Sequence, residues 1–75
     1  MINLKRESVV SSRIESIGYD KRKEILQIMF KRGGLYEYRP VTPQEHLDLM
    51  SAVSPGKFFD EHIRDRDDIE SEKIM

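Results

Sequence analysis

Two tyrosines are the side chains of this sequence best suited to binding a ligand. Tyr36 and Tyr38 follow a double glycine at residues 33–34, in the order Tyr-x-Tyr. Because a strand alternates its side chains between two faces, both rings must share one face of any strand that carries them. Such a pair either packs into a small core or forms a platform on which unpaired bases stack. The sequence leaves both alternatives open.

Two short basic runs accompany the tyrosines. The first is a polar turn of three residues, Lys21, Arg22 and Lys23. The second is Lys31-Arg32. Successive turns of an antiparallel meander lie at opposite ends of the sheet, so the two runs cannot form one patch. We expect Arg39 beside the first run and Arg13 beside the second. These cations could bind phosphates, or they could simply be solvated turn residues.

A third candidate is the loop Ser-Pro-Gly-Lys at residues 54–57. A helix that begins there would offer free amides and a positive dipole end, and Lys57 would add a cation. A phosphate or a carboxylate could bind at such a site. Capping by Ser54 explains the same residues, and no Walker-type glycine spacing is present.

Nothing in the sequence indicates catalysis. His46 and His62 have acidic neighbours but no His-x-x-x-His spacing, and no serine has an evident base. The chain has no cysteine, which excludes disulfides and the usual structural zinc sites. We therefore expect a protein that is not an enzyme and that uses no catalytic residue, metal or cofactor.

The charge of the chain is balanced overall but uneven along its length. The 75 residues carry 13 basic and 14 acidic groups, a net charge of −1. Residues 64–75 hold three basic and five acidic groups, a balance of −2. No apolar run is long enough for a signal peptide or a membrane span, so we expect a cytoplasmic protein that does not contact membranes.

A three-stranded antiparallel meander would position the candidate residues. Alternating apolar residues predict strands over residues 11–19, 24–31 and 35–41. In the middle strand Leu26, Ile28 and Phe30 share one face. In the first strand the alternation slips between Ile14 and Ile17, and a β-bulge near Gly18 would repair it.

Two short helices are predicted after the strands. Residues 42–45, Thr-Pro-Gln-Glu, have the pattern of a capping box with proline at the first helical position. Leu47, Met50 and Val53, with His46 and Leu49 beside them, would then face the core. Residues 54–57 would begin the second helix, with Phe58 and Phe59 on its apolar edge. The predicted fold class is α+β, with both helices on one face of the sheet. We place a single domain at residues 8–64 and a disordered charged tail at residues 65–75.

The order of these elements resembles the KTSC domain family, over about residues 9–64 of the chain. The matching residues are Ser11, Ser12, Ile17, Gly18, Tyr19, Asp20, Phe30, Gly33, Tyr36, Tyr38, Ala52, Ser54, Gly56, Phe58 and Phe59. At position 46 the chain has histidine where relatives more often carry an aromatic or aliphatic residue. The family is named for its occurrence at the C-terminus of some lysyl-tRNA synthetases. It also includes short proteins of bacteria and phages. The resemblance therefore implies that the protein is located in the cytoplasm of a bacterium or of a phage-infected host.

The resemblance implies RNA binding, by association with the synthetase. Our leading hypothesis is a small binding module for RNA or another phosphate-bearing ligand. The assigned residues are Tyr36 and Tyr38 for stacking, Lys21, Arg22, Lys23 and Arg39 for phosphates, and Lys57 for a further anion contact. The alternative is a protein–protein adaptor, or a phage-encoded inhibitor of a host protein, that uses the sheet edge or the acidic tail. The domain could also form a homodimer.

Overall fold

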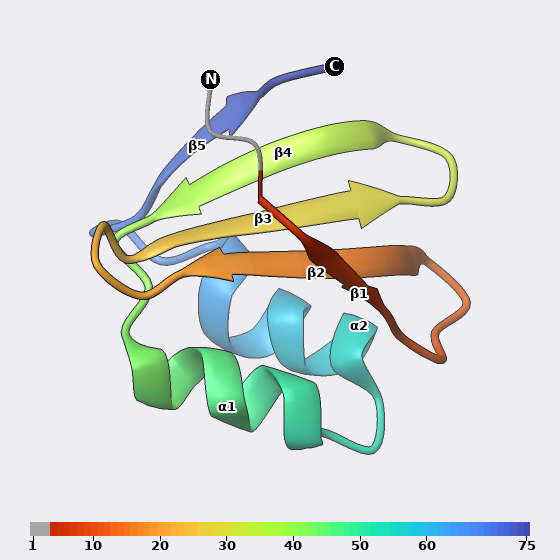
Figure 1. The fold of residues 1–75 in the computed structure, drawn as a ribbon. Coiled ribbons are helices and arrows are strands. Elements are labelled where there is room, and N and C mark those ends of the chain that lie inside the picture. The colour runs from red at the N-terminus through yellow and green to blue at the C-terminus, as the bar shows by residue number, and fades with distance from the viewer. Residues whose placement is uncertain (1–3) are drawn as a thin grey trace.

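The computed structural model describes residues 4–75 as an antiparallel sheet with both helices on one of its faces (Figure 1). The five strands follow the order of the chain. They are β1 (Arg6–Ser8), β2 (Ile14–Asp20), β3 (Ile25–Phe30), β4 (Gly34–Arg39) and β5 (Glu70–Lys73). The helices are α1 (Pro43–Ser51) and α2 (Pro55–Phe59), and α2 continues into a π-helical turn, η1 (Asp60–Arg64). The predicted α+β class is confirmed, but the sheet has five strands where three were expected.

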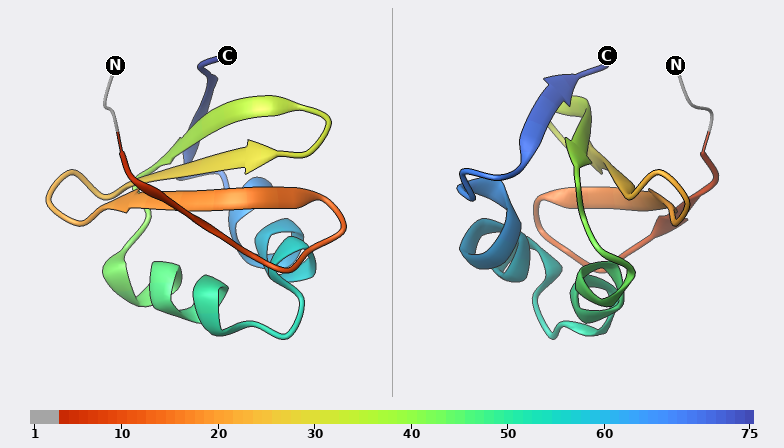
Figure 2. Two further views of the ribbon diagram at one scale, coloured as in Figure 1. Left: turned by 45° about the vertical axis from the view of Figure 1, so that its right-hand side comes forward. Right: turned by 90° about the vertical axis from the view of Figure 1, so that its left-hand side faces the viewer.

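The register of the sheet places both tyrosines of β4 on the face that the helices cover. Ile28 pairs with Tyr36 and Leu26 pairs with Tyr38, so all four side chains point the same way. The helices lie against that face, as two further views show (Figure 2), and its side chains form the core with them. The buried core residues are Ile14, Ile17, Leu26, Ile28, Tyr38, Val41, Leu49, Phe59 and Ile63.

A bulge is present in β2 as predicted, but it lies between Ile14 and Ser16 and not near Gly18. The pairing of β2 with β3 shifts between Ile14 and Ser16, while Gly18 pairs regularly with Gln27. The shift brings Ile14 opposite Phe30 and onto the covered face, where it is fully buried. The bulge therefore directs the Ile14 side chain into the core, whereas strict alternation would have directed it outward.

Helix α1 begins as predicted but faces the core with different residues. The Thr42 hydroxyl accepts from the Glu45 amide, and the Glu45 carboxylate accepts from the Thr42 amide, which completes the capping box. The predicted core positions Leu47 and Val53 are wrong: both are exposed, and Val53 lies beyond the helix end at Ser51. Leu49 is the buried residue of the helix. No helix within residues 4–75 is long and apolar enough to cross a membrane.

A row of polar side chains crosses the outer face of the sheet, away from the helices. Gln27 Nε2 donates to Glu37 at 2.8 Å, and Arg6 Nη1 donates to the Gln27 amide oxygen at 3.2 Å. Arg39 donates to Glu37 at 3.3 Å and to Glu72 at 3.1 Å. A Cβ at Gly18, the β2 position in this row, would lie 2.9 Å from Cγ of Arg6, so the glycine leaves room for that arginine.

The charged C-terminal segment forms a strand and not the expected disordered tail. Residues of β5 are all exposed, and main-chain pairing with β4 places them in the sheet. Beyond β5 the Leu35 amide donates to the Met75 carbonyl at 3.1 Å, and the Ile74 amide donates to the Leu35 carbonyl at 2.7 Å. Backbone pairing does not require an apolar stripe, so the sequence of this strand lacks the alternation that predicts strands.

Candidate functional site

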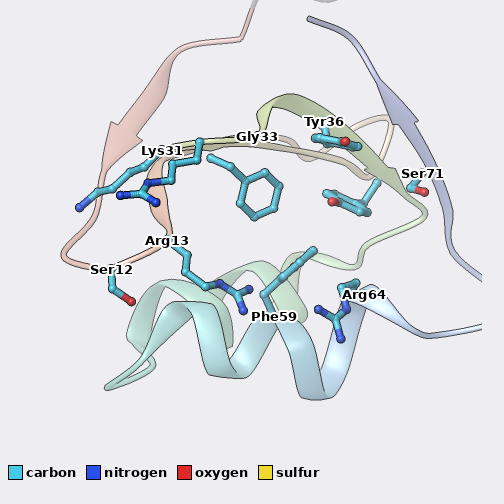
Figure 3. Close-up of a pocket in the computed structure, with 11 residues that line it drawn as sticks. Ser12, Arg13, Lys31, Gly33, Tyr36, Phe59, Arg64 and Ser71 are labelled. Carbon is cyan, nitrogen blue, oxygen red and sulfur yellow. The ribbon is translucent and has the colours of Figure 1, made fainter.

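A cleft opens between the covered face of the sheet and the segment α2–η1. Its volume is about 590 Å³. Side chains from four parts of the chain converge on it, namely the β1–β2 loop, the β3–β4 hairpin, the end of α2 with η1, and β5 (Figure 3). The lining residues are Ser12, Arg13, Phe30, Lys31, Arg32, Gly33, Tyr36, Tyr38, Phe59, Arg64 and Ser71.

Four aromatic rings form the wall of the cleft. The rings of Tyr36 and Tyr38 are nearly parallel, with centroids 6.3 Å apart. Phe30 meets Tyr36 edge-on at 5.7 Å, and Phe59 meets Tyr38 edge-on at 5.0 Å. These offset and edge-to-face arrangements are the ones that aromatic pairs prefer, so the wall is a well-packed surface.

The two tyrosines have different environments within this wall. Tyr38 is 5% exposed and belongs to the core, whereas Tyr36 is half-buried and borders the cleft. Burial raises the pKa of Tyr38 to about 12, with a smaller contribution from Tyr36 and a partial offset from Arg64. The Tyr38 hydroxyl is therefore uncharged at neutral pH. Of the two tyrosines, Tyr36 therefore has the more accessible ring.

Four cations surround the aromatic wall. Arg13 and Lys31 lie close together because the Lys31 amide donates to the Arg13 carbonyl at 2.9 Å, which joins the β1–β2 loop to the β3–β4 hairpin. Arg32 follows in the hairpin, and Arg64 reaches the cleft from η1. No acidic residue lines the cleft in the described part of the chain. The site thus combines apolar rings with positive charge.

Asp60 joins two of these cations at the side of the cleft formed by α2 and η1. Arg13 donates to its two carboxylate oxygens at 2.6 and 2.8 Å, and Arg64 approaches one of them at 3.1 Å. The hydrogen bonds from Arg13 hold the pKa of Asp60 below its usual value, with burial opposing and both guanidinium charges adding to the effect. The carboxylate therefore stays ionised at neutral pH.

The structure separates the seven residues that the sequence suggested for ligand binding. Tyr36 and Tyr38 line the cleft. The first basic run, Lys21, Arg22 and Lys23, is exposed in the β2–β3 turn, at the opposite end of the sheet from the β3–β4 hairpin (Figure 1). Arg39 lies on the outer face, bonded to Glu37 and Glu72.

Lys57 does not line the cleft either. Its ammonium group lies 3.9 Å from Glu61, one turn further along. Ser54 caps α2 by accepting from the Lys57 amide at 3.4 Å, so the loop at residues 54–57 acts as a helix start. Gly56 is buried against Ser11 and Arg13, which leaves no room there for a ligand.

The cationic side of the cleft was only partly foreseen. The meander predicts Arg13 beside Lys31 and Arg32, and the structure confirms that grouping. The sequence pattern places Arg64 at the end of the domain, before the predicted tail, and it does not indicate the π-helical turn that carries this residue. Such turns are rare and often occur at functional sites.

Each of the two histidine rings packs against an aromatic side chain. The ring of His62 packs against Phe58 at 4.5 Å and that of His46 stacks on Tyr19 at 4.4 Å. Within residues 4–75, no three His, Cys, Asp or Glu side chains are grouped closely enough to hold a metal ion.

Comparisons with known proteins agree with this architecture. The KTSC domain family matches residues 10–66. The crystal structure of a KTSC domain protein from Yersinia pestis superposes with a TM-score of 0.88 at 41% identity, covering 97% of this chain and 100% of that one. An uncharacterized protein of Stutzerimonas stutzeri is 38% identical over 58 residues, which cover 77% of this chain and 82% of the relative. A protein of Tsukamurella paurometabola is 38% identical over 60 residues, covering 80% of this chain and 90% of the relative.

Proposed function

The chain belongs to the KTSC domain family, and we propose that it is a non-enzymatic module that binds single-stranded RNA. The proposal rests on the geometry of its cleft. The observation that carries the proposal is the meeting of an aromatic wall and four cations in one cleft. Proteins that bind single strands combine these two features, since bases stack on aromatic rings and phosphates pair with basic side chains.

Tyr36 is the stacking residue in this proposal. Its ring borders the cleft and is supported from behind by Phe30 and Tyr38. A base stacked on such a ring contributes roughly 1–3 kcal/mol with little dependence on sequence. Tyr38 supports the wall from the core instead of contacting the base with its full face.

Of the four cations of the cleft, Lys31 and Arg32 are the ones that an approaching phosphate would contact first. Both are exposed, and neither forms an ion pair among the described residues. The cleft volume falls within the range of about 300–1,000 Å³ typical of small-ligand sites, so it fits a short stretch of strand. A duplex keeps its bases stacked inside and cannot present one to Tyr36.

The adaptor alternative receives less support from the fold. Its proposed docking element, the acidic C-terminal segment, is the edge strand β5, whose exposed side chains include Glu70, Glu72 and Lys73. Charged side chains on an edge strand oppose pairing with a further strand.

An NMR titration of the ¹⁵N-labelled protein with a short single-stranded RNA tests the proposed function. We expect the largest amide shift changes at Gly33, Tyr36, Phe59 and Arg64, and small changes in the β2–β3 turn. A duplex of the same sequence is the control and should cause much smaller changes. Shift changes confined to Lys21, Arg22 and Lys23, or none at all, would contradict the proposal.

A further inference from the structure

Asp60 has no role in the binding scheme above, yet it is in contact with two of the four cleft cations. Arg13 comes from the β1–β2 loop and Arg64 from η1, and both guanidinium groups point to the same carboxylate. The pair with Arg13 is bidentate, with distances of 2.6 and 2.8 Å. Both side chains of this ion pair are partly buried, with exposed fractions of 44% for Arg13 and 27% for Asp60.

This arrangement is also the one by which arginines bind phosphate. A planar guanidinium donates two parallel hydrogen bonds to carboxylate and to phosphate oxygens alike. Two guanidinium groups that already share one anion can share another in the same position. Lys31 lines the same cleft, and its backbone lies beside that of Arg13 because the Lys31 amide donates to the Arg13 carbonyl.

We infer that Arg13 and Arg64 form the phosphate subsite of the cleft, and that Asp60 occupies this subsite in the free protein as an internal competing anion. The inference rests on the proposed function for the identity of its ligand, a phosphate of single-stranded RNA. A strand that enters the cleft must displace Asp60 from the two arginines before its own phosphate binds there.

The displacement costs little, because partly exposed ion pairs contribute little to stability. Among the described residues, the hydrogen bonds and ion pairs formed by the Asp60 side chain go to Arg13 and Arg64 alone. Lys31 and Arg32, which form no ion pair among the described residues, lie at the hairpin end of the cleft and attract the RNA first. Asp60 therefore sets the affinity of the site and lowers its net charge while no ligand is bound.

Asp60→Asn tests the inference, since it removes the competing charge while keeping the size of the side chain. Glu61→Gln is the matched control, because it makes the same change one residue later, on a carboxylate that does not contact Arg13 or Arg64. Fluorescence anisotropy with a labelled single-stranded RNA should show Asp60→Asn binding about fivefold tighter, as expected for releasing one partly exposed ion pair. The slope of log K against log salt should become steeper by about 0.7, the value for one more available cation on a single strand.

Glu61→Gln should stay within about twofold of the wild type, since it acts only through distant, screened charge. If Asp60→Asn binds no tighter than Glu61→Gln, the internal-competitor role is wrong. If it binds more weakly than the wild type, Asp60 orders the arginines for the ligand and does not compete with it, which also overturns the inference.

A second measurement separates this inference from the proposed function. Inorganic phosphate is titrated into both proteins while the Nε–Hε resonances of Arg13 and Arg64 are followed by NMR. These resonances should shift at lower phosphate concentration in Asp60→Asn than in the wild type. That result together with no RNA binding would leave the subsite standing and refute the RNA proposal. Equal phosphate responses in the two proteins would refute the competing role of Asp60 even where RNA binds, and no response of either arginine would refute the subsite.

Discussion

At the scale of single residues, two tyrosines two positions apart have different roles. They share a face of β4, but Tyr38 lies over the centre of the core and Tyr36 lies toward its margin, beside the cleft. The alternation of a strand predicts that the two rings share a face. It does not predict which ring the helices cover, because that depends on the register and on where α2 crosses the sheet.

Replacing Tyr36 should separate stacking from folding. Tyr36→Ala removes the half-buried ring at the cleft and should weaken RNA binding by roughly 1–3 kcal/mol, the contribution of one stacked base. Tyr36→Phe keeps the ring and should bind nearly as well as the wild type. Anisotropy titrations of the three proteins provide the measurement. Equal affinity of Tyr36→Ala and Tyr36→Phe would mean that the ring does not stack with the ligand.

Replacing Tyr38 should instead damage the fold. Its ring packs edge-on against Phe59 and next to Tyr36 within the core. Tyr38→Ala should lower the free energy of unfolding by about 3–5 kcal/mol, the usual cost of truncating a large aromatic core side chain. Urea denaturation followed by circular dichroism measures the loss. A loss below about 1 kcal/mol would show that the ring is not part of the core.

At the scale of elements, the strands with alternating apolar residues and the capped helix α1 were predictable from sequence. The capping box of Thr42 and Glu45 fixes the start of α1 through local hydrogen bonds. The edge strands β1 and β5 were not predictable, because their side chains are mostly exposed and their pairing is carried by the backbone. The core face of α1 was missed because Leu49, and not Leu47, is directed inward once the helix is docked.

The position of β5 depends on a glycine in the β3–β4 hairpin. Gly34 has a φ of +87°, and a Cβ added there would lie 2.1 Å from the Met75 carbonyl oxygen. Gly34→Ala should therefore destabilise the protein by more than about 1 kcal/mol, since both the backbone conformation and the close approach are lost. Hydrogen exchange should show a loss of protection at the Leu35 amide, which donates to that carbonyl.

Gly33→Ala is the matched control for this change. A Cβ at Gly33 would meet Phe30 at 3.4 Å, an ordinary contact distance, and its backbone is outside the positive-φ region. The free energy of unfolding of Gly33→Ala should stay within about 0.5 kcal/mol of the wild-type value. If both alanine variants lose the same stability, the close approach of the C-terminal segment is not what requires glycine.

The docking of α1 on β2 should depend on pH through His46. Its ring stacks on Tyr19 at 4.4 Å, and burial lowers its pKa, with Glu7 opposing. A histidine whose pKa is lower in the folded state stabilises the protein fully above its unfolded pKa of about 6.5, and this contribution is lost as the pH falls through the folded value. Wild-type stability should therefore fall on acidification from neutral pH into the region below that value.

His46→Phe keeps a ring on Tyr19 but cannot take up a proton. Urea midpoints measured across this pH range should fall less for His46→Phe than for the wild type. The same pH dependence in both proteins would show that His46 is not the group that responds.

At the scale of the whole molecule, the two faces of the sheet have different chemistry. On the outer face Arg39 is paired with the carboxylates of Glu37 and Glu72, and Arg6 donates to the Gln27 amide oxygen in the same row. The helix-covered face ends in the cleft, where Lys31 and Arg32 have no acidic partner among the described residues. The order of the strands predicts that Arg13 joins them, and the capped start of α2 predicts an apolar Phe59, while Arg64 enters the site through η1, which no pattern in the sequence indicates.

The charge distribution gives the most direct test of the central claim, which is that RNA binds in this cleft. The measurement compares two double variants of equal charge change, Lys31→Ala/Arg32→Ala at the cleft and Lys21→Ala/Arg22→Ala at the opposite end of the sheet. Anisotropy with a labelled single-stranded RNA is recorded over a series of salt concentrations. We predict that the cleft variant binds more weakly and that its salt slope falls by about 1.4, as expected for losing two phosphate contacts, while the turn variant stays like the wild type. Equal losses in the two variants, or a larger loss in the turn variant, would contradict the assignment of the cleft as the RNA site.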